Sequence, residues 1–160
     1  MQLQRHGAKG ALLDEYERAF SDLKSTIAVI STQELTAIVD PDTSDPDCHS
    51  IQTVLTHVVR SGIGYATYIR QQQGEAIDFP TSETCASVED YALALDAAFL
   101  CTEKTFETYP DLELETSDPE QKIRVRWGQL YDVEQLMEHA IVHVLRHRRQ
   151  VEGFIKIVRQ

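Results

Sequence analysis

Three of the six histidines, His139, His143 and His147, recur at every fourth position of one segment. On a helix, residues four apart have Cβ atoms ~5–6 Å from each other, so two imidazoles can bind one ion through N–metal bonds of ~2.0–2.1 Å. The outer two histidines are separated by roughly 12 Å along the helix axis, which is too far to share an ion. The spacing therefore predicts a metal-binding pair, either His139 with His143 or His143 with His147. The alternative is a solvated face of histidine and arginine side chains.

The apolar side of this segment decides between the two pairs. A helical wheel at ~100° per residue places the mean apolar direction some 70–80° from His143, on the His147 side, and more than about 100° from His139. His143 and His147 are therefore expected to face inward. Typical zinc and nickel sites use three protein ligands, so a third must come from another segment. We expect it to be His57, at the edge of the apolar face of residues 51–72. The alternative for His57 is an ordinary hydrogen-bonded core histidine.

Other metal and catalytic motifs are missing from the sequence. Ala140 stands where an HExxH metalloprotease has its general-base Glu. None of the four candidate histidines has a Glu three residues before it, which excludes the Glu-x-x-His pairs of ferritin-like di-iron proteins. The chain also lacks GxGxxG, P-loop and GxSxG motifs. His6 and His49 are expected in a disordered N-terminal end and in a loop, away from the candidate site.

Apolar residues recur with steps of three and four along four segments, which predicts four amphipathic helices. Ser50, Ser87 (in a capping box with Asp90) and Asp132 are suited to cap three of them, and Gly74 is suited to end one. The expected helices span residues 11–30, 51–72, 88–109 and 133–158, with a short helical turn at 35–39 and a loop at 40–47.

Two further features bear on how these helices are arranged. Between residues 111 and 128 the apolar period changes to two, which predicts an extended crossover that can hold a small hairpin. Gly62 and Gly64 weaken the middle of the second helix. Two physical explanations are the close approach of a neighbouring helix and that of a ligand, and the alternative is chance. Four long helices with two sizeable connections predict an all-α protein built as a four-helix bundle.

Composition limits the class of protein. The 160 residues have 42% hydrophobic and 26% charged side chains, as expected for one globular domain spanning 1–160. A formal charge of −11 disfavours nucleic acid and anionic membranes as partners. The three cysteines lack CxxC spacing, which favours a reducing cytoplasm. No stretch is apolar enough to span a bilayer, and Met1 to Gly10 lack the apolar core of a secretion signal.

Two segments resemble the DinB/YfiT-like family of four-helix-bundle metalloproteins. One is residues 50–70, with His57 in the sequence TVLTHVVRSG. The other is residues 135–154, where His139, His143 and His147 are followed by Arg-Arg-Gln. The latter is similar to the family signature H-x3-H-x3-H-R-G-Q, with Arg149 at the usual Gly position. Helix order, connection lengths and chain length extend the resemblance over most of the chain.

The resemblance implies a divalent ion, most often nickel or zinc, held by His57, His143 and His147, with His139 as a supporting or entrance residue. It also implies a metal-dependent transferase that uses a low-molecular-weight thiol, because an open position on the ion favours the nucleophilic thiolate. Arginines 146, 148 and 149 are candidates to bind carboxylates of that thiol. Relatives often pair, so a homodimer is expected. The alternative function is a non-catalytic bundle with a structural ion or none, acting through protein–protein interaction.

Overall fold

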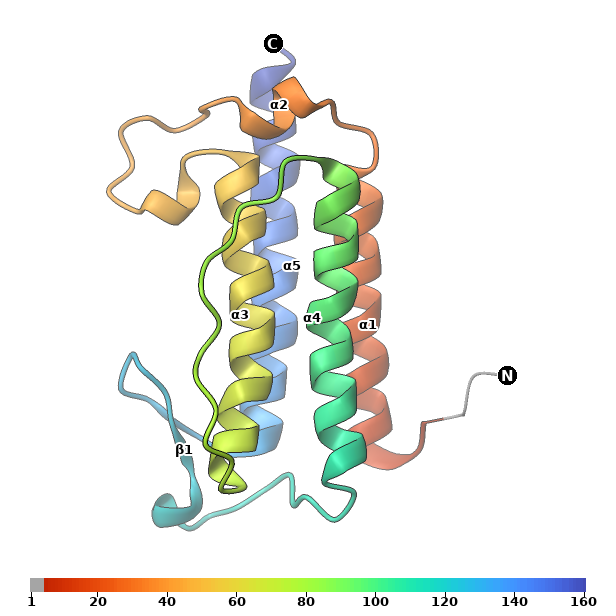
Figure 1. The fold of residues 1–160 in the computed structure, drawn as a ribbon, viewed down its shortest axis with the longest axis vertical. Helices are drawn as coiled ribbons and strands as arrows, with labels where there is room; N and C mark the ends of the chain where they lie inside the picture. The colour runs from red at the N-terminus through yellow and green to blue at the C-terminus, as the bar shows by residue number, and fades with distance from the viewer. Residues whose placement is uncertain (1–4) are drawn as a thin grey trace.

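The computed structural model describes residues 5–160, and within them most of the chain is helical. Four long helices lie side by side as a bundle, and short elements occupy their connections (Figure 1). The long helices are α1 (Gly7–Ile27), α3 (Ile51–Gln72), α4 (Val88–Thr108) and α5 (Val133–Val158). The short elements are α2 (Thr32–Thr36), the 3-10 turns η1 (Pro46–Cys48) and η2 (Pro119–Gln121), β1 (Ile123–Arg124) and β2 (Leu130–Tyr131). The expected helical bundle is therefore present. Residues 1–4, which belong to the stretch where no secretion signal is expected, lie outside the described residues.

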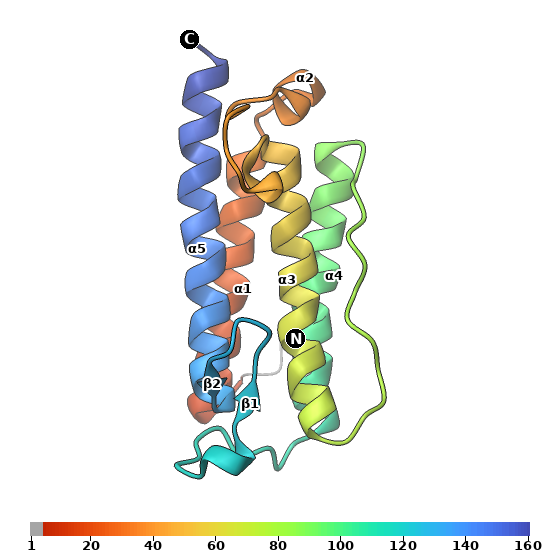
Figure 2. The same cartoon turned by 90° about the vertical axis from the view of Figure 1, so that its left-hand side faces the viewer.

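The four long helices form a ring in which α1 packs on α5, α5 on α3, α3 on α4 and α4 on α1. Figures 1 and 2 show α1 and α5 running in one direction and α3 and α4 in the other. Because α3 and α4 are parallel neighbours, the chain must return along the whole bundle between them. The connection 73–87 makes this return along the outside of α3 and α4 (Figure 2).

Capping residues define the ends of these helices largely as expected. Ser50 accepts a hydrogen bond from the backbone N–H of Thr53 at 3.1 Å, and Asp132 accepts one from that of Gln135 at 2.8 Å. Gly74 lies just beyond α3 with φ +90°, a conformation that glycine adopts without strain. The predicted range 51–72 matches α3 at both ends, because a strong cap and a strong stop bracket it.

The start of α1 differs from its prediction, since the helix begins at Gly7 instead of residue 11 and ends at Ile27 instead of residue 30. The additional N-terminal turn, residues 7–10, has no apolar residues at helical spacing that would predict it. It is held instead by Arg5, which pairs with Glu17 at 2.7 Å and reaches Glu103 on α4. His6 is the N-cap residue of α1, so the expectation of a disordered end there is wrong.

The capping box predicted at α4 is only half formed. Ser87 accepts from the backbone N–H of Asp90 at 3.1 Å, but its hydroxyl also donates to the Asp90 carboxylate. The short helix α2 begins at Thr32, before the expected residue 35, because Ser31 and Glu34 form a complete reciprocal capping box.

Close packing at Gly62 brings α3 against its neighbours. A Cβ added there would lie 3.2 Å from the Cβ of Ala98 on α4 and 3.2 Å from a ring carbon of Phe20 on α1. The glycine thus allows three helices to approach, which is one of the two explanations expected from the sequence. Gly64 has no comparable contact with a helix and lies instead at a cavity.

The crossover before α5 contains the small hairpin that the period of two suggested. β1 pairs antiparallel with β2, with Ile123 opposite Tyr131, so the hairpin extends beyond residue 128. Gly128 turns the chain with φ +91°. Ile123 and Val125 are buried against the bundle, whereas Trp127 remains half exposed. The hairpin lies between α3 and α5 (Figure 2), and its Trp127 ring stacks on His139 of α5.

Among residues 5–160, no helix combines the length and the apolar character that a membrane crossing requires.

Candidate metal centre

His57 on α3 meets His143 and His147 on α5. One ring nitrogen from each of the three lies within 4.8 Å of the others. The Nε2 atoms of His57 and His143 are 2.9 Å apart. Two nitrogens bound to one tetrahedral ion through ~2.0–2.1 Å bonds would be separated by about 3.3 Å, so the His57–His143 pair needs a shift of only a few tenths of an ångström. This group could hold a metal ion.

The other ring nitrogen is held by a partner in two of these histidines. His57 Nδ1 donates to the Asp47 carboxylate at 2.9 Å, and His147 Nδ1 donates to Gln150 Oε1 at 2.8 Å. A carboxylate accepts and does not donate, so the contact with Asp47 favours the neutral tautomer with the proton on Nδ1 and the lone pair on Nε2; Arg60 Nη2 lies 3.2 Å from the same Nδ1 and donates to the same carboxylate. Metal-binding histidines are typically oriented by such hydrogen bonds. The arrangement is thus the one expected of ligands aimed at a common ion.

His143 differs because its Nδ1 is buried and has no hydrogen-bond partner among the described residues. Burial lowers the pKa of His143 to about 2, with smaller contributions from the nearby His147 and His57. Burial also lowers the pKa of His147. Both rings therefore stay neutral at physiological pH, and neutral imidazole is the form that binds metal.

The loop before α3 supplies Asp47 to the site. Asp45 accepts a hydrogen bond from the backbone N–H of Asp47 at 3.0 Å and starts the 3-10 turn η1. The Asp47 carboxylate also accepts from Arg60 at 2.9 Å, so one oxygen ties His57 to a cation on the next turn of α3. Cys48 follows at the end of η1, and burial raises the pKa of its thiol. This thiol is therefore less readily ionised than a free cysteine thiol, which disfavours it as a nucleophile.

His139 does not join the three-histidine group. Its ring stacks on Trp127 with centroids 5.2 Å apart and meets Tyr65 edge-on at 5.7 Å. The stack with His143 is more distant, at 6.3 Å. The structure thus separates the two candidate pairs as the helical wheel does, with His143 and His147 converging and His139 held among aromatic side chains.

The arginines next to the His-x3-His-x3-His motif do not line the cavity beside His57, although the charge of Arg146 adds to the lowering by burial of the pKa of His143 and His147. Arg148 pairs with Asp22 on α1 at 2.7 Å and with Glu152 at 3.4 Å. Arg146 and Arg149 are exposed, and neither lines the cavity beside His57. Arg149 at the usual glycine position of the signature therefore adds its bulk toward solvent.

A cavity of about 420 Å³ opens beside His57. Arg60, Gly64 and Tyr65 of α3 form one side, and Arg126 and Trp127 of the hairpin form another. Its volume is within the range of small-molecule sites. Through His57, the three-histidine group adjoins a space in which a second molecule can bind.

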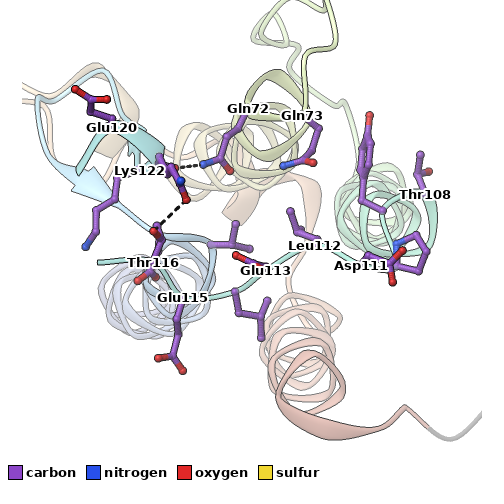
Figure 3. Close-up of a pocket in the computed structure, with 16 residues that line it drawn as sticks. Gln72, Gln73, Thr108, Asp111, Leu112, Glu113, Glu115, Thr116, Glu120 and Lys122 are labelled. Atoms are coloured by element: carbon purple, nitrogen blue, oxygen red, sulfur yellow. Dashed lines mark hydrogen bonds between the residues drawn. The ribbon is translucent and has the colours of Figure 1, made fainter. Parts of the chain in front are cut away.

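A larger hollow of about 740 Å³ lies at the end of the bundle (Figure 3). It is lined by acidic and amide side chains, among them Gln72, Glu113 and Glu115, and by no histidine. Gln72 is fifteen residues after His57 on α3, or roughly 22 Å along the helix at ~1.5 Å per residue. The two hollows have no lining residue in common, although their linings come within one turn of each other on α3, at Tyr68 and Gln72.

Comparison of the chain with protein-family models, with curated proteins and with solved structures gives no match. The resemblance to the DinB/YfiT-like family accordingly stays a prediction.

Sequence reasoning named Gln150 only as part of the signature, without a role, and missed Asp47 and Arg126, which also shape this site. Gln150 is three residues after His147, one helical turn away, so its spacing was a usable signal. Asp47 and Arg126 reach the site from a loop and a hairpin, and no periodic pattern marks them.

Proposed function

We propose that this protein is a DinB-like metalloprotein that binds one divalent ion, nickel or zinc, through His57, His143 and His147. The observation that carries the proposal is the convergence of these imidazoles from two helices, with His57 and His147 each oriented by a hydrogen bond on the far nitrogen. The donor set fits such an ion, because imidazole nitrogen suits zinc and nickel equally well.

We further propose that the protein is a transferase in which a low-molecular-weight thiol is the nucleophile. No fourth His, Cys, Asp or Glu side chain joins the group within residues 5–160, and a cavity adjoins His57. Structural zinc sites are normally closed by four protein ligands, so these two observations favour a reactive role over a structural ion. A divalent ion bound there would act as a Lewis acid and favour the thiolate form of a thiol.

The residues of the chain have distinct roles in this proposal. Asp47 holds the His57 ring in the orientation and tautomer that present Nε2. Gln150 does the same for His147. Arg60 partly neutralises Asp47, so the site keeps a carboxylate without presenting a full negative charge to an incoming thiolate.

Metal content is the first test. Tag-free protein purified without chelators should contain about one ion per chain by mass spectrometry. His57→Ala and His143→Ala should each contain none, because all three imidazoles share one ion. His139→Ala is the matched control, since it removes a histidine of the same helix that lies outside the group, and it should keep the ion. Equal loss in His139→Ala and His143→Ala would contradict this assignment.

Thiol binding is the second test and separates the reactive from the structural reading. Protein loaded with Co²⁺ should gain a sulfur-to-cobalt charge-transfer band in the near ultraviolet when a thiol such as cysteine is added. A loaded protein whose spectrum does not respond to any thiol would favour a structural ion.

The proposal includes a homodimer, which equilibrium sedimentation tests.

A further inference from the structure

The cavity beside His57 has an unusual charge for this protein. The chain carries 26 acidic and 15 basic side chains, yet no Asp or Glu lines this cavity, and two arginines do. The larger hollow at the end of the bundle shows the opposite character, with several carboxylates on its walls (Figure 3). The cavity near the histidines is thus the one of these two hollows suited to an anion.

Arg126 carries the charge that is available to a ligand. Its side chain is exposed, and no ion pair involves it among residues 5–160. The guanidinium lies over the ring of Phe79, 4.0 Å from the ring centroid, which fixes its plane by a cation–π contact. Its backbone N–H donates to the hydroxyl of Tyr68 at 2.9 Å. Arg60, by contrast, already shares Asp47 with His57.

Aromatic side chains form a wall next to this cation. Tyr68 meets Phe79 edge-on with centroids 4.6 Å apart and meets Trp127 at 6.5 Å. These residues come from α3, from the connection 73–87 and from the hairpin, so the wall is assembled from three segments. Trp127 is 49% exposed, which leaves apolar ring surface for a ligand to cover.

We propose that this cavity binds an aromatic carboxylate, with the carboxylate on Arg126 and the ring against the wall of Tyr68, Phe79 and Trp127. A guanidinium fork matches a carboxylate with two parallel hydrogen bonds, and flat rings pack on aromatic side chains with little loss of conformational entropy. The remainder of the ligand then extends toward His57. Only this last point rests on the proposed function, because binding itself requires no metal.

Isothermal titration of the full chain with 2-naphthoate tests the proposal. Saturable binding is expected, with quenching or enhancement of the fluorescence of Trp127, the single tryptophan of the chain. The neutral match 2-naphthalenemethanol should bind about tenfold or more weakly, because it lacks a charge-assisted hydrogen bond. Cyclohexanecarboxylate, which has the charge without the flat ring, should also bind more weakly. Absence of saturable 2-naphthoate binding would overturn the proposal.

Variants locate the contact. Arg126→Gln should lose about tenfold or more in affinity for 2-naphthoate, and Arg126→Lys should fall between it and the wild type, since it keeps the charge and loses the fork. Arg124→Gln is the matched control, because Arg124 is exposed on the same hairpin and does not line the cavity. Equal affinity in Arg126→Gln and Arg124→Gln would overturn the placement of the carboxylate.

His143→Ala separates this proposal from the proposed function. In that variant 2-naphthoate binding should persist while the metal is lost. If the wild type binds no metal and still binds 2-naphthoate through Arg126, the metal proposal fails and the anion pocket stands. Thermal unfolding of each variant, followed by circular dichroism, checks that the fold is retained.

Discussion

Replacing Asp47 with Ala should weaken metal binding although Asp47 lies outside the three-histidine group. Its carboxylate accepts from His57 Nδ1 and from Arg60, both at 2.9 Å. Without it, the His57 ring can rotate or bind a proton at Nε2, and the Arg60 charge next to the site is no longer balanced. Loss of such an outer hydrogen bond typically lowers metal affinity by about 10–100-fold, which corresponds to roughly 1.4–2.8 kcal/mol.

The assay is competition for Zn²⁺ between the protein and a chromogenic chelator of known affinity. Asp47→Asn should fall between wild type and Asp47→Ala, because the amide oxygen still accepts a hydrogen bond but no longer carries charge. Asp42→Ala provides the control, since it removes an exposed carboxylate from the same loop and should bind Zn²⁺ as the wild type does. If Asp47→Ala and Asp42→Ala bind Zn²⁺ equally, the carboxylate does not orient His57 and the reasoning fails.

Two further predictions concern stability and are measured by urea unfolding. Gly62→Val should lower the free energy of unfolding by about 1–3 kcal/mol, because even a Cβ at this position would lie 3.2 Å from the Cβ of Ala98. Gly153→Ala, at an open position of α5, should raise the free energy of unfolding by up to about 1 kcal/mol. Equal effects of the two substitutions would contradict the close packing of α3 at Gly62. The Arg159 guanidinium holds the pKa of Glu34 at about 2 in the folded chain, below its ordinary 4.5. This carboxylate therefore stabilises the fold above pH 4.5, and its contribution is lost as the pH falls toward 2. The difference in unfolding free energy between the wild type and Glu34→Gln should become smaller as the pH falls through that range. A difference that does not change with pH would show that the ion pair is not its cause.

Local signals explain which parts of the fold were predictable from the sequence. Ser50 and Gly74 define α3 because a cap and a left-handed glycine act within one helical turn of the chain they end. The first turn of α1 depends instead on contacts of Arg5 with distant carboxylates, one of them on α4. Such contacts do not affect the local apolar pattern, and the start of α1 that the pattern predicts is therefore four residues too late.

The same distinction applies to the candidate site. The inward direction of His143 and His147 is a property of one helix, and the wheel captures it because the apolar stripe must face the core. The meeting with His57 depends on how α3 packs against α5, for which the sequence offers the place of His57 at the edge of an apolar face and the resemblance, but no direct signal of helix pairing. Asp47 and Arg126 reach the site from a 3-10 turn and from a hairpin, where no helical periodicity predicts which way a side chain faces.

The parallel course of α3 and α4 has a consequence for how the pocket can change. It forces a long non-helical return, and that return supplies Phe79 and Pro80 to the cavity wall, while the imidazoles come from α3 and α5. The proposed metal ligands thus stand on two core helices, under the packing constraints of the bundle, whereas one part of the proposed ligand-binding wall stands on a loop that tolerates exchange. Grafting other sequences into residues 75–84 is therefore a route to new ligand preferences on an unchanged set of metal ligands.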